Sequence, residues 1–404
     1  MNFSALVERV RGEGAVAWRT HYAAVAARER GADVIILSVG DPDLDTPAPV
    51  IERAIHQLRA GDTHYLPTAG RLALREAIAR AHTRRSGQVV GAENVIYLAG
   101  AQNALFVSSL CLAGPGDEVL ALEPLYPTYT ATIEVSGARL VPVPATAACR
   151  PDMAALAKLI GPRTRAILWA SPNNPSGVVL NEAELEAIGE FARRHQLWLI
   201  CDEVYAGLAP SGRVPSLGAR LPDRVVTLGS LSKSHAMTGW RAGWLVGPRE
   251  LTLHAEHVAM CMLFGLPGFI QEAVITALDL ADEAEARIRA YCADRQSRFT
   301  SGIAGIPGLQ PLPPEAGMFM LIDVSATGLS GAEFVQALYA TQGVSVMDGA
   351  AFGASTARCV RVCFATDEST LDRACARLRE FCEHHLPKKM RAANAARTDV
   401  PPIR

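Results

Sequence analysis

The sequence predicts an α/β fold: a mostly parallel sheet sandwiched by helices, joined to a smaller α+β domain. Between about residues 50 and 280, short apolar runs of strand length alternate with helical patterns. This alternation is typical of β-α-β units, in which helices cover both faces of a parallel sheet. After about residue 255 it gives way to a long charged helical stretch and then to mixed strands and helices. The 404 residues suffice for two such domains.

The strands expected in the large sheet are continuous apolar runs, as is typical of strands buried on both faces. They are Val95–Leu98, Glu118–Leu122, Ala166–Trp169, Trp198–Cys201, Val225–Leu228 and Gly243–Val246. The helical patterns that separate most of them are Ala101–Leu112, Pro127–Ser136, Met153–Ile160 and Glu182–His195. Ligands of such sheets bind outside the carboxyl ends of the strands. Residues that directly follow these runs are therefore the first candidates for a site.

The two ends of the chain are expected to form the smaller domain together. Residues 1–30 predict one amphipathic helix with an extended segment after it, and residues 1–45 are expected to complete the small domain. Residues 46–285 are expected to form the large domain and residues 286–386 the small C-terminal domain. Residues 387–404 have no periodic apolar face and predict a disordered tail. The elements expected after residue 270 are Gln271–Ser301, Gly317–Asp323, Gly331–Gln342, Val344–Met347, Cys359–Phe364 and Glu368–His384.

Composition and charge exclude several classes of protein. The net charge of −2 argues against a nucleic-acid or membrane surface. The nine cysteines lack metal-ligand spacing, so we expect reduced thiols and no metal site. No apolar run has the length of a membrane span, and the first thirty residues contain no apolar signal core. These features predict a cytoplasmic protein.

The segment Ser230-Leu231-Ser232-Lys233 directly follows the apolar run Val225–Leu228, and Arg241 comes eight residues after the lysine. A lysine that forms a Schiff base must be neutral when it attacks, which requires desolvation or a nearby cation. Neighbouring hydroxyls and a guanidinium suit a phosphate. The same residues could equally form a surface loop with a satisfied arginine, so the local chemistry alone leaves both interpretations open.

The whole string Ser230–Arg241 closely resembles the Schiff-base lysine motif of the class I/II aminotransferases of fold type I, in which S-x-S-K precedes a G-x-R element. The resemblance extends over roughly residues 10 to 385. It implies a pyridoxal 5′-phosphate enzyme that moves an α-amino group from an amino acid to a keto acid by a ping-pong mechanism. Lys233 would form the Schiff base and shuttle the proton during catalysis.

The resemblance assigns three strand-end residues and one aromatic residue to the cofactor ring. Asp202 would pair with the pyridine nitrogen and keep it protonated, so that the ring accepts electrons. Tyr205 and Asn174 would hydrogen-bond the phenolic oxygen, and Asn174 precedes Pro175 in a bond expected to be cis. Tyr126 would stack on the ring, although a tyrosine of the hydrophobic core is the alternative. Asp202 and Tyr205 are counted as catalytic residues beside Lys233.

The resemblance also implies a cup for the phosphate at the start of a helix. Small residues after the run Val95–Leu98 would let backbone N–H groups approach the anion, and the helix dipole would favour its charge. Tyr65 matches a tyrosine that reaches the phosphate in the neighbouring subunit, which implies a homodimer with shared active sites. The expected phosphate contacts within one chain are Gly100, Ala101, Gln102, Ser230, Ser232 and Arg241.

Arg361 lies inside the apolar run Cys359–Phe364, where an unpaired charge would be costly. The resemblance assigns it to the substrate α-carboxylate, which a guanidinium can hold through two parallel hydrogen bonds. Gly40, in Gly40-Asp41-Pro42-Asp43, would donate its N–H to the same carboxylate, and Asn174 would line the same substrate site.

For the substrate, the chain most resembles arginine–pyruvate aminotransferases. The resembling stretches are residues 14–18, 21–22, 37–43, 46–49, 230–241, 261–265 and 269–271. A guanidinium side chain calls for a carboxylate near the mouth of the site, and Glu13 and Asp348 are the candidates, although ordinary solvated acids are more common. Three alternatives stay open. They are a broad-specificity aminotransferase for glutamine, aromatic or kynurenine-like donors, a pyridoxal-phosphate lyase on the same fold, and a regulator with an aminotransferase-like ligand domain.

Overall fold

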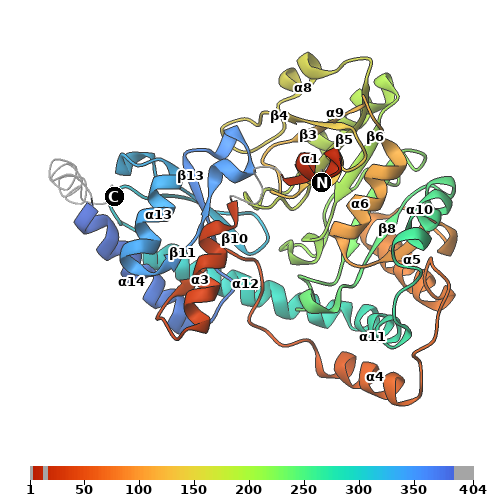
Figure 1. Cartoon of the computed structure of the whole chain (residues 1–404), viewed down its shortest axis with the longest axis horizontal. Helices are drawn as coiled ribbons and strands as arrows, with labels where there is room; N and C mark the ends of the chain where they lie inside the picture. Colours follow the sequence, from red (N-terminus) through yellow and green to blue (C-terminus); the bar gives the residue numbers. More distant parts are fainter. Residues whose placement is uncertain (1–2, 12–16, 386–404) are drawn as a thin grey trace, which may run out of the picture.

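The protein consists of two lobes, each built around its own sheet (Figure 1). The computed structural model describes residues 3–11 and 17–385. The larger lobe holds a seven-stranded sheet, and the smaller lobe holds a four-stranded sheet and a two-stranded one. The long helix α12 (Ala281–Ile303) starts beside the large lobe and runs into the small one. The expected domain boundaries at residues 45 and 285 stay predictions.

The large sheet is mostly parallel, as predicted. β8 alone runs antiparallel to its two neighbours, and the remaining strands pair in parallel. The strand order is β2 (Val95–Leu98), β8 (Gly243–Val246), β7 (Val225–Ser230), β6 (Trp198–Asp202), β5 (Thr164–Ala170), β3 (Glu118–Leu122) and β4 (Arg139–Val143). β4 was not predicted, because as an edge strand it is partly exposed and has no continuous apolar run.

Helices cover both faces of this sheet because successive side chains of each strand point to opposite sides. In β2, Ile96 and Leu98 pack in one core cluster and Val95 and Tyr97 in another. The first cluster is shared with α6 (Ala101–Leu112), α7 (Tyr129–Glu134) and α10 (Arg249–Met262). The opposite face is covered by α4 (Ala48–Arg59), α5 (Leu72–Ser86), α8 (Met153–Leu159), α9 (Glu182–His195) and α11 (Gly268–Asp279).

The small lobe joins the beginning of the chain to its end. β1 (Ile35–Ile36) pairs in parallel with β11 (Val344–Ser345), and the N–H of Cys363 donates to the carbonyl of Leu37 at 2.8 Å. This pairing brings the segment after β1 against β13, the strand that contains Arg361. The other elements are β9 (Gln310–Leu312), β10 (Phe319–Asp323), β12 (Met347–Asp348), β13 (Cys359–Cys363), α13 (Gly331–Gln342) and α14 (Glu368–His385).

Two helices differ from the sequence-based expectation. The single helix expected over Gln271–Ser301 is interrupted at Leu280, between α11 and α12. No glycine or proline marks this break, and it falls where the apolar α11 packs on the large lobe and the charged α12 leaves it. Within the described part of residues 1–30, two helices, α1 (Ala5–Arg11) and α3 (Arg19–Glu29), replace the single helix expected. The expected disordered tail lies outside the described residues.

Covalent crosslinks and membrane spans contribute nothing to the described structure. All nine cysteines are free thiols. Across residues 3–11 and 17–385, no helix is both long enough and apolar enough to cross a bilayer. The described part of the fold is therefore held by non-covalent interactions: packing, hydrogen bonds and ion pairs such as Arg85–Glu285.

Gly243 in β8 allows the sheet to approach the turn that opens α6. A Cβ atom at residue 243 would lie 2.5 Å from Cα of Gly100, which is backbone and cannot rotate away. We expect Gly243→Ala to lower the free energy of unfolding by about 1–3 kcal/mol. Thermal or urea unfolding measures this loss. Gly161→Ala is the control, since its Cβ would meet no atom within 4 Å, and equal losses in both variants would contradict the prediction.

Candidate active site

A cavity of about 280 Å³ opens at the carboxyl ends of β5, β6 and β7, between the two lobes. Of the residues expected to bind the cofactor or the substrate α-carboxylate, all except Gly100 and Tyr65 line it. The structure therefore brings together residues that are as far apart in the sequence as Gly40 and Arg361.

Lys233 follows the end of β7 in a segment held by its own hydroxyl groups. The Ser230 hydroxyl accepts the N–H of Ser232 at 3.0 Å and lies 2.7 Å from the carbonyl oxygen of Ala242. Nζ of Lys233 donates to the carbonyl of Gly40 at 2.6 Å. Burial lowers the pKa of Lys233, which favours the neutral amine that a nucleophile or base requires.

A histidine that sequence reasoning missed fixes the far end of this segment. Nε2 of His235 lies 3.0 Å from the carbonyl oxygen of Ala277 in α11, and Nδ1 lies 2.8 Å from the Ser234 hydroxyl. Burial lowers the pKa of His235 to about 4, so the ring is neutral. It donates through Nε2 to the carbonyl and accepts the serine hydroxyl through Nδ1. The lysine segment is thereby tied to α11.

The start of α6 and Arg241 form one cationic part of the cavity wall. Gly100 has φ of +90°, and a Cβ there would lie 2.4 Å from the Arg241 guanidinium. That guanidinium donates to the carbonyls of Thr238 at 2.7 Å and Ala99 at 3.1 Å. Among the described residues it has no carboxylate partner. An unpaired guanidinium beside the N–H groups of a helix start is suited to a phosphate.

Gln102 can contribute to this wall through its backbone, as expected, because its side chain is engaged elsewhere. Its side chain accepts from the Thr128 hydroxyl at 2.7 Å and donates to the Thr132 hydroxyl at 2.6 Å. The side-chain amide is therefore already hydrogen-bonded to the hydroxyls of Thr132 in α7 and of Thr128 just before that helix. The backbone N–H at the first turn of α6 is what Gln102 can offer to an anion.

Asp202 lies at the end of β6 with both carboxylate oxygens engaged. Oδ2 accepts the Tyr129 hydroxyl at 2.6 Å, and Oδ1 accepts the N–H of Val204 at 3.1 Å. Burial raises the pKa of Asp202, and the Tyr129 hydrogen bond partly offsets this rise. Tyr129 was not assigned a role from the sequence. Its spacing of three residues from Tyr126 was the available signal, since both tyrosines line the cavity.

The predicted neighbours of the ring also meet at one place. The Asn174 amide donates to the Tyr205 hydroxyl at 3.4 Å. The rings of Tyr126 and Tyr129 are 5.8 Å apart and meet edge to face. The Asn174–Pro175 bond is cis, which confirms that expectation. Aromatic and polar groups thus line the cavity together.

Arg361 is only 1% exposed, yet no carboxylate pairs with it among the described residues. Nη1 donates to Oδ1 of Asn174 at 3.0 Å, and Nη2 donates to the carbonyl of Ser38. The guanidinium also lies over the rings of Phe319, at 4.2 Å, and Phe352, at 4.9 Å. Its Nε has no partner. A buried cation without a counter-charge, facing a cavity, is suited to an anionic ligand.

Three other candidates lie outside this cavity or outside the described chain. Tyr65 is 85% exposed and packs edge to face on Phe264 at 4.9 Å. Asp348 accepts the N–H of Ala350 at 3.0 Å and caps the short helix Gly349–Phe352. Since Asp348 does not line the cavity, the structure does not support it as a contact for a substrate side chain. Glu13 lies outside the described residues.

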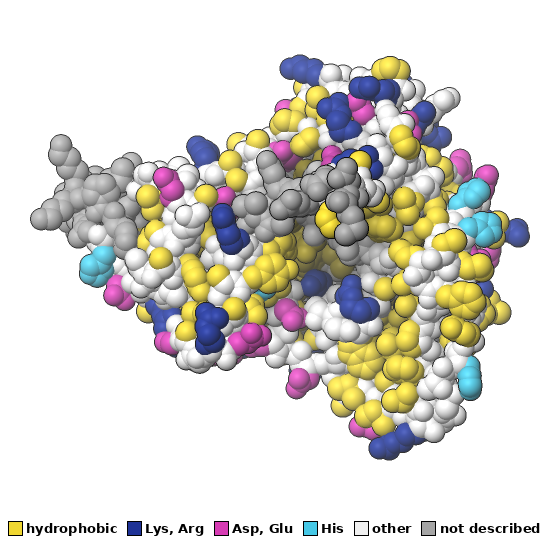
Figure 2. Space-filling view, in the orientation of Figure 1, with side chains coloured by type: hydrophobic (Ala, Val, Ile, Leu, Met, Phe, Trp, Pro, Cys, Tyr) yellow, Lys and Arg dark blue, Asp and Glu magenta, His cyan; other side chains and the backbone are white. Residues whose placement is uncertain are grey.

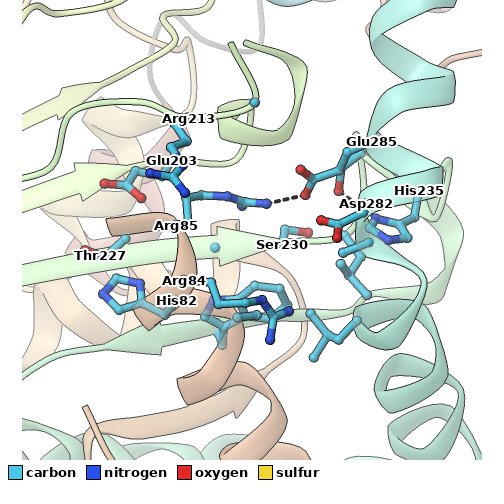
Figure 3. A pocket seen from close by; sticks show the side chains of 18 residues that line it. His82, Arg84, Arg85, Glu203, Arg213, Thr227, Ser230, His235, Asp282 and Glu285 are labelled. Atoms are coloured by element: carbon cyan, nitrogen blue, oxygen red, sulfur yellow. Dashed lines mark hydrogen bonds and ion pairs between the residues drawn. The ribbon is translucent and has the colours of Figure 1, made fainter. Parts of the chain in front are cut away.

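A second cavity, also of about 280 Å³, lies on the other side of the lysine segment (Figure 3). It is lined by the ion pair between Arg85 and Glu285 and by buried Glu203, whose pKa burial raises to about 7. It shares only Ser230 with the first cavity. Because Lys233 and Arg361 both face the first cavity, the second is not the candidate active site.

These features match one protein family. Residues 32–378 match the model of aminotransferase class I and II, and the chain belongs to this family. Its cofactor is pyridoxal 5′-phosphate. The donor set of the first cavity fits that group, because it combines a lysine amine, an unpaired guanidinium at a helix start and a buried carboxylate.

The relatives cover almost the whole chain. An arginine–pyruvate transaminase of Pseudomonas aeruginosa is 48% identical over 384 residues, 94% of this chain and 97% of its own. The aspartate/prephenate aminotransferase of Thermus thermophilus is 32% identical, over 88% of this chain and 92% of its own. The solved structure of the Thermus thermophilus aspartate aminotransferase with maleate superposes with a TM-score of 0.89 and 31% identity, covering 94% of this chain and all of that one.

The hydrogen bond between Tyr129 and Asp202 gives a test of the site geometry. In Tyr129→Phe the pKa of Asp202 should rise further, because the hydroxyl that stabilises its charged form is lost. A hydrogen bond to a charged group contributes about 1.5–3 kcal/mol, so we expect kcat to fall by roughly tenfold or more. Steady-state kinetics on the holoenzyme checks this.

Tyr97→Phe is the matched control for that variant. Tyr97 is also buried, but its hydroxyl has no hydrogen-bond partner. Its removal should leave kcat unchanged. If kcat were the same in both variants, the hydrogen bond between Tyr129 and Asp202 would make no contribution to catalysis.

Proposed function

We propose that this aminotransferase transfers the α-amino group of arginine to pyruvate. The observation that carries the proposal is the identity of 48% to the Pseudomonas aeruginosa arginine–pyruvate transaminase over nearly the full length of both chains. Relatives named for aspartate and prephenate are markedly less similar, at about 30% identity. The unpaired, buried Arg361 supports an amino-acid substrate, since every such substrate carries an α-carboxylate.

The substrate carboxylate is held by Arg361, with Gly40 and Asn174 beside it. The guanidinium is already oriented by the Asn174 side chain and the Ser38 carbonyl. Its orientation therefore costs little entropy when the substrate binds. Because Nζ of Lys233 lies 2.6 Å from the Gly40 carbonyl, the substrate Cα is placed next to the lysine amine.

The cofactor is held by the other walls of the cavity. Arg241, Ser230, Ser232 and the first turn of α6, from Gly100 through Ala101 and Gln102, hold the phosphate. Asp202 would hold the proton on the ring nitrogen, Tyr205 and Asn174 would hydrogen-bond the phenolic oxygen, and Tyr126 would pack on the ring face. When bound, pyridoxal phosphate supplies an aldehyde carbon and a ring that accepts electrons.

Lys233 is both the attachment point and the proton carrier. Lys233 would hold the cofactor, and once its amine is free it would take the proton from the substrate Cα as base and donate it as acid to the cofactor carbon that carried the aldehyde. Burial lowers its pKa, which favours the neutral amine that the first of these steps requires. The keto acid product leaves before the second substrate enters, so the kinetics are ping-pong.

The functional unit is a cytoplasmic homodimer in this proposal. Figure 2 shows hydrophobic side chains gathered on the large lobe, beside the hollow between the lobes. The large exposed apolar side chains of this lobe include Leu58, Tyr65, Leu72, Met260 and Phe264. A second subunit would cover them, and Tyr65 would reach the phosphate in the partner's active site.

Lys233→Ala should lose transamination entirely, because no other lysine among the described residues lines the cavity. It should also lose the absorbance of the lysine-bound cofactor, which a spectrum of the purified protein measures. Lys158→Ala, at the last turn of α8, is the control and should retain both. Turnover by the Lys233 variant at more than a trace would refute its assignment.

A panel of amino donors tests the substrate assignment. With pyruvate as acceptor, arginine should give the highest kcat/KM, and 2-oxoglutarate should replace pyruvate poorly. Turnover of glutamine or aromatic donors without turnover of arginine would overturn the assignment of arginine as the donor. The aminotransferase assignment would stay intact. Product release that needs no keto acid would instead indicate a lyase.

A further inference from the structure

Given the proposed arginine substrate, the structure raises the question of what holds its guanidinium group. Among the described residues that line the cavity, Asp202 is the only acidic one, and both of its oxygens are already hydrogen-bonded. Arg361 and Lys233 fix the carboxylate and the Cα of the substrate, so its side chain must lie along the remaining walls. Those walls contain aromatic rings and no free carboxylate.

Trp18 is the one tryptophan among the described cavity residues, and it is half-buried immediately before α3. The face of an indole attracts a guanidinium more strongly than the ring of a tyrosine or phenylalanine does. Guanidinium groups are also weakly hydrated and stack readily on flat rings. Trp18 therefore offers what the cavity otherwise lacks, a surface that favours a cation without supplying a formal charge.

The position of Trp18 is linked to the residue that binds the substrate carboxylate. Its ring meets the His21 ring edge to face at 5.4 Å. Nδ1 of His21 lies 2.9 Å from the hydroxyl of Ser38, whose carbonyl accepts from Arg361. A second serine, Ser345, donates to the same hydroxyl at 2.9 Å. This series of contacts fixes the position of the indole relative to the Arg361 guanidinium.

His21 is suited to this place because its surroundings favour the neutral imidazole. Burial lowers its pKa, and the nearby guanidinium groups of Arg28 and Arg361 lower it further. A charged imidazolium beside the indole would repel a cationic side chain. The neutral ring instead fixes the indole without adding positive charge to the wall.

We propose that Trp18 is a specificity-determining residue of the proposed arginine site, which binds the substrate guanidinium on its indole face. Arg361 binds the other end of the substrate, and the contacts through Ser38 and His21 set the separation between the two. A side chain of the right length with a cationic end would then be favoured over a neutral one of the same shape.

Citrulline is the probe for this proposal, since it replaces the guanidinium of arginine by a neutral urea of nearly the same shape. For Trp18→Leu we expect the ratio of kcat/KM for arginine to that for citrulline to fall about 3- to 30-fold, the range of a cation–π contact. Trp18→Phe should keep part of the preference. The absorbance of the lysine-bound cofactor should be unchanged in both variants.

Binding without turnover provides a second readout. 5-Guanidinopentanoate carries both end groups of arginine but no amine, so it cannot react, and 5-ureidopentanoate is its neutral counterpart. Calorimetry on the wild-type holoenzyme should show tighter binding of the guanidino compound, and Trp18→Leu should reduce that difference.

The outcomes separate this inference from the proposed function. If wild-type enzyme turns over arginine but the ratio is unchanged in Trp18→Leu, the role of Trp18 is overturned alone. If the ratio of kcat/KM for arginine to that for citrulline falls in Glu13→Gln and not in Trp18→Leu, the role of Trp18 is likewise overturned while the arginine assignment stands. If the wild type does not accept arginine, the arginine assignment fails, and the role of Trp18 fails with it.

Discussion

The active site depends on how the buried guanidinium of Arg361 is stabilised. A charge at 1% exposure without a counter-ion would cost several kcal/mol if nothing replaced its hydration. Here the replacement comes from three parts of the chain: the Ser38 carbonyl near the N-terminus, the Asn174 amide of the large lobe and two phenylalanine rings of the small lobe. Because these partners are neutral, the positive charge is solvated by the protein and still available to a substrate.

The same arrangement connects the two lobes. Asn174 contacts Arg361 through its oxygen and Tyr205 through its nitrogen. Lys233 of the large lobe reaches the carbonyl of Gly40, which packs on Phe319 so closely that a Cβ would lie 2.3 Å from that ring. Catalytic and substrate-binding groups therefore share hydrogen bonds across the boundary between the lobes, and the geometry of each depends on the other.

Sequence reasoning located most of this site because its residues follow apolar runs that are easy to recognise. Lys233, Asp202 and Asn174 come after β7, β6 and β5, and strand ends meet at one edge of a parallel sheet. Trp18 and His235 were missed because their contacts are made across the fold and no local pattern reports them, whereas Tyr129 was marked only by its spacing from Tyr126. The break at Leu280 was missed for a related reason, since packing and not a helix-breaking residue determines it. Asp348, one of two candidate contacts for a guanidinium, instead caps a turn, and an acidic residue in sequence carries no sign of such a cap.

The pairing of β1 with β11 has a consequence for the order of events during synthesis. The large-lobe strands, β2 to β8, lie between these partners in the sequence and can assemble as soon as they leave the ribosome. Ile35 and Ile36 must wait for Val344 and Ser345, about three hundred residues later. Arg361 is made later still. A nascent chain can therefore fold its large lobe before the Arg361 guanidinium exists, and the complete carboxylate site forms only after β13 has been made.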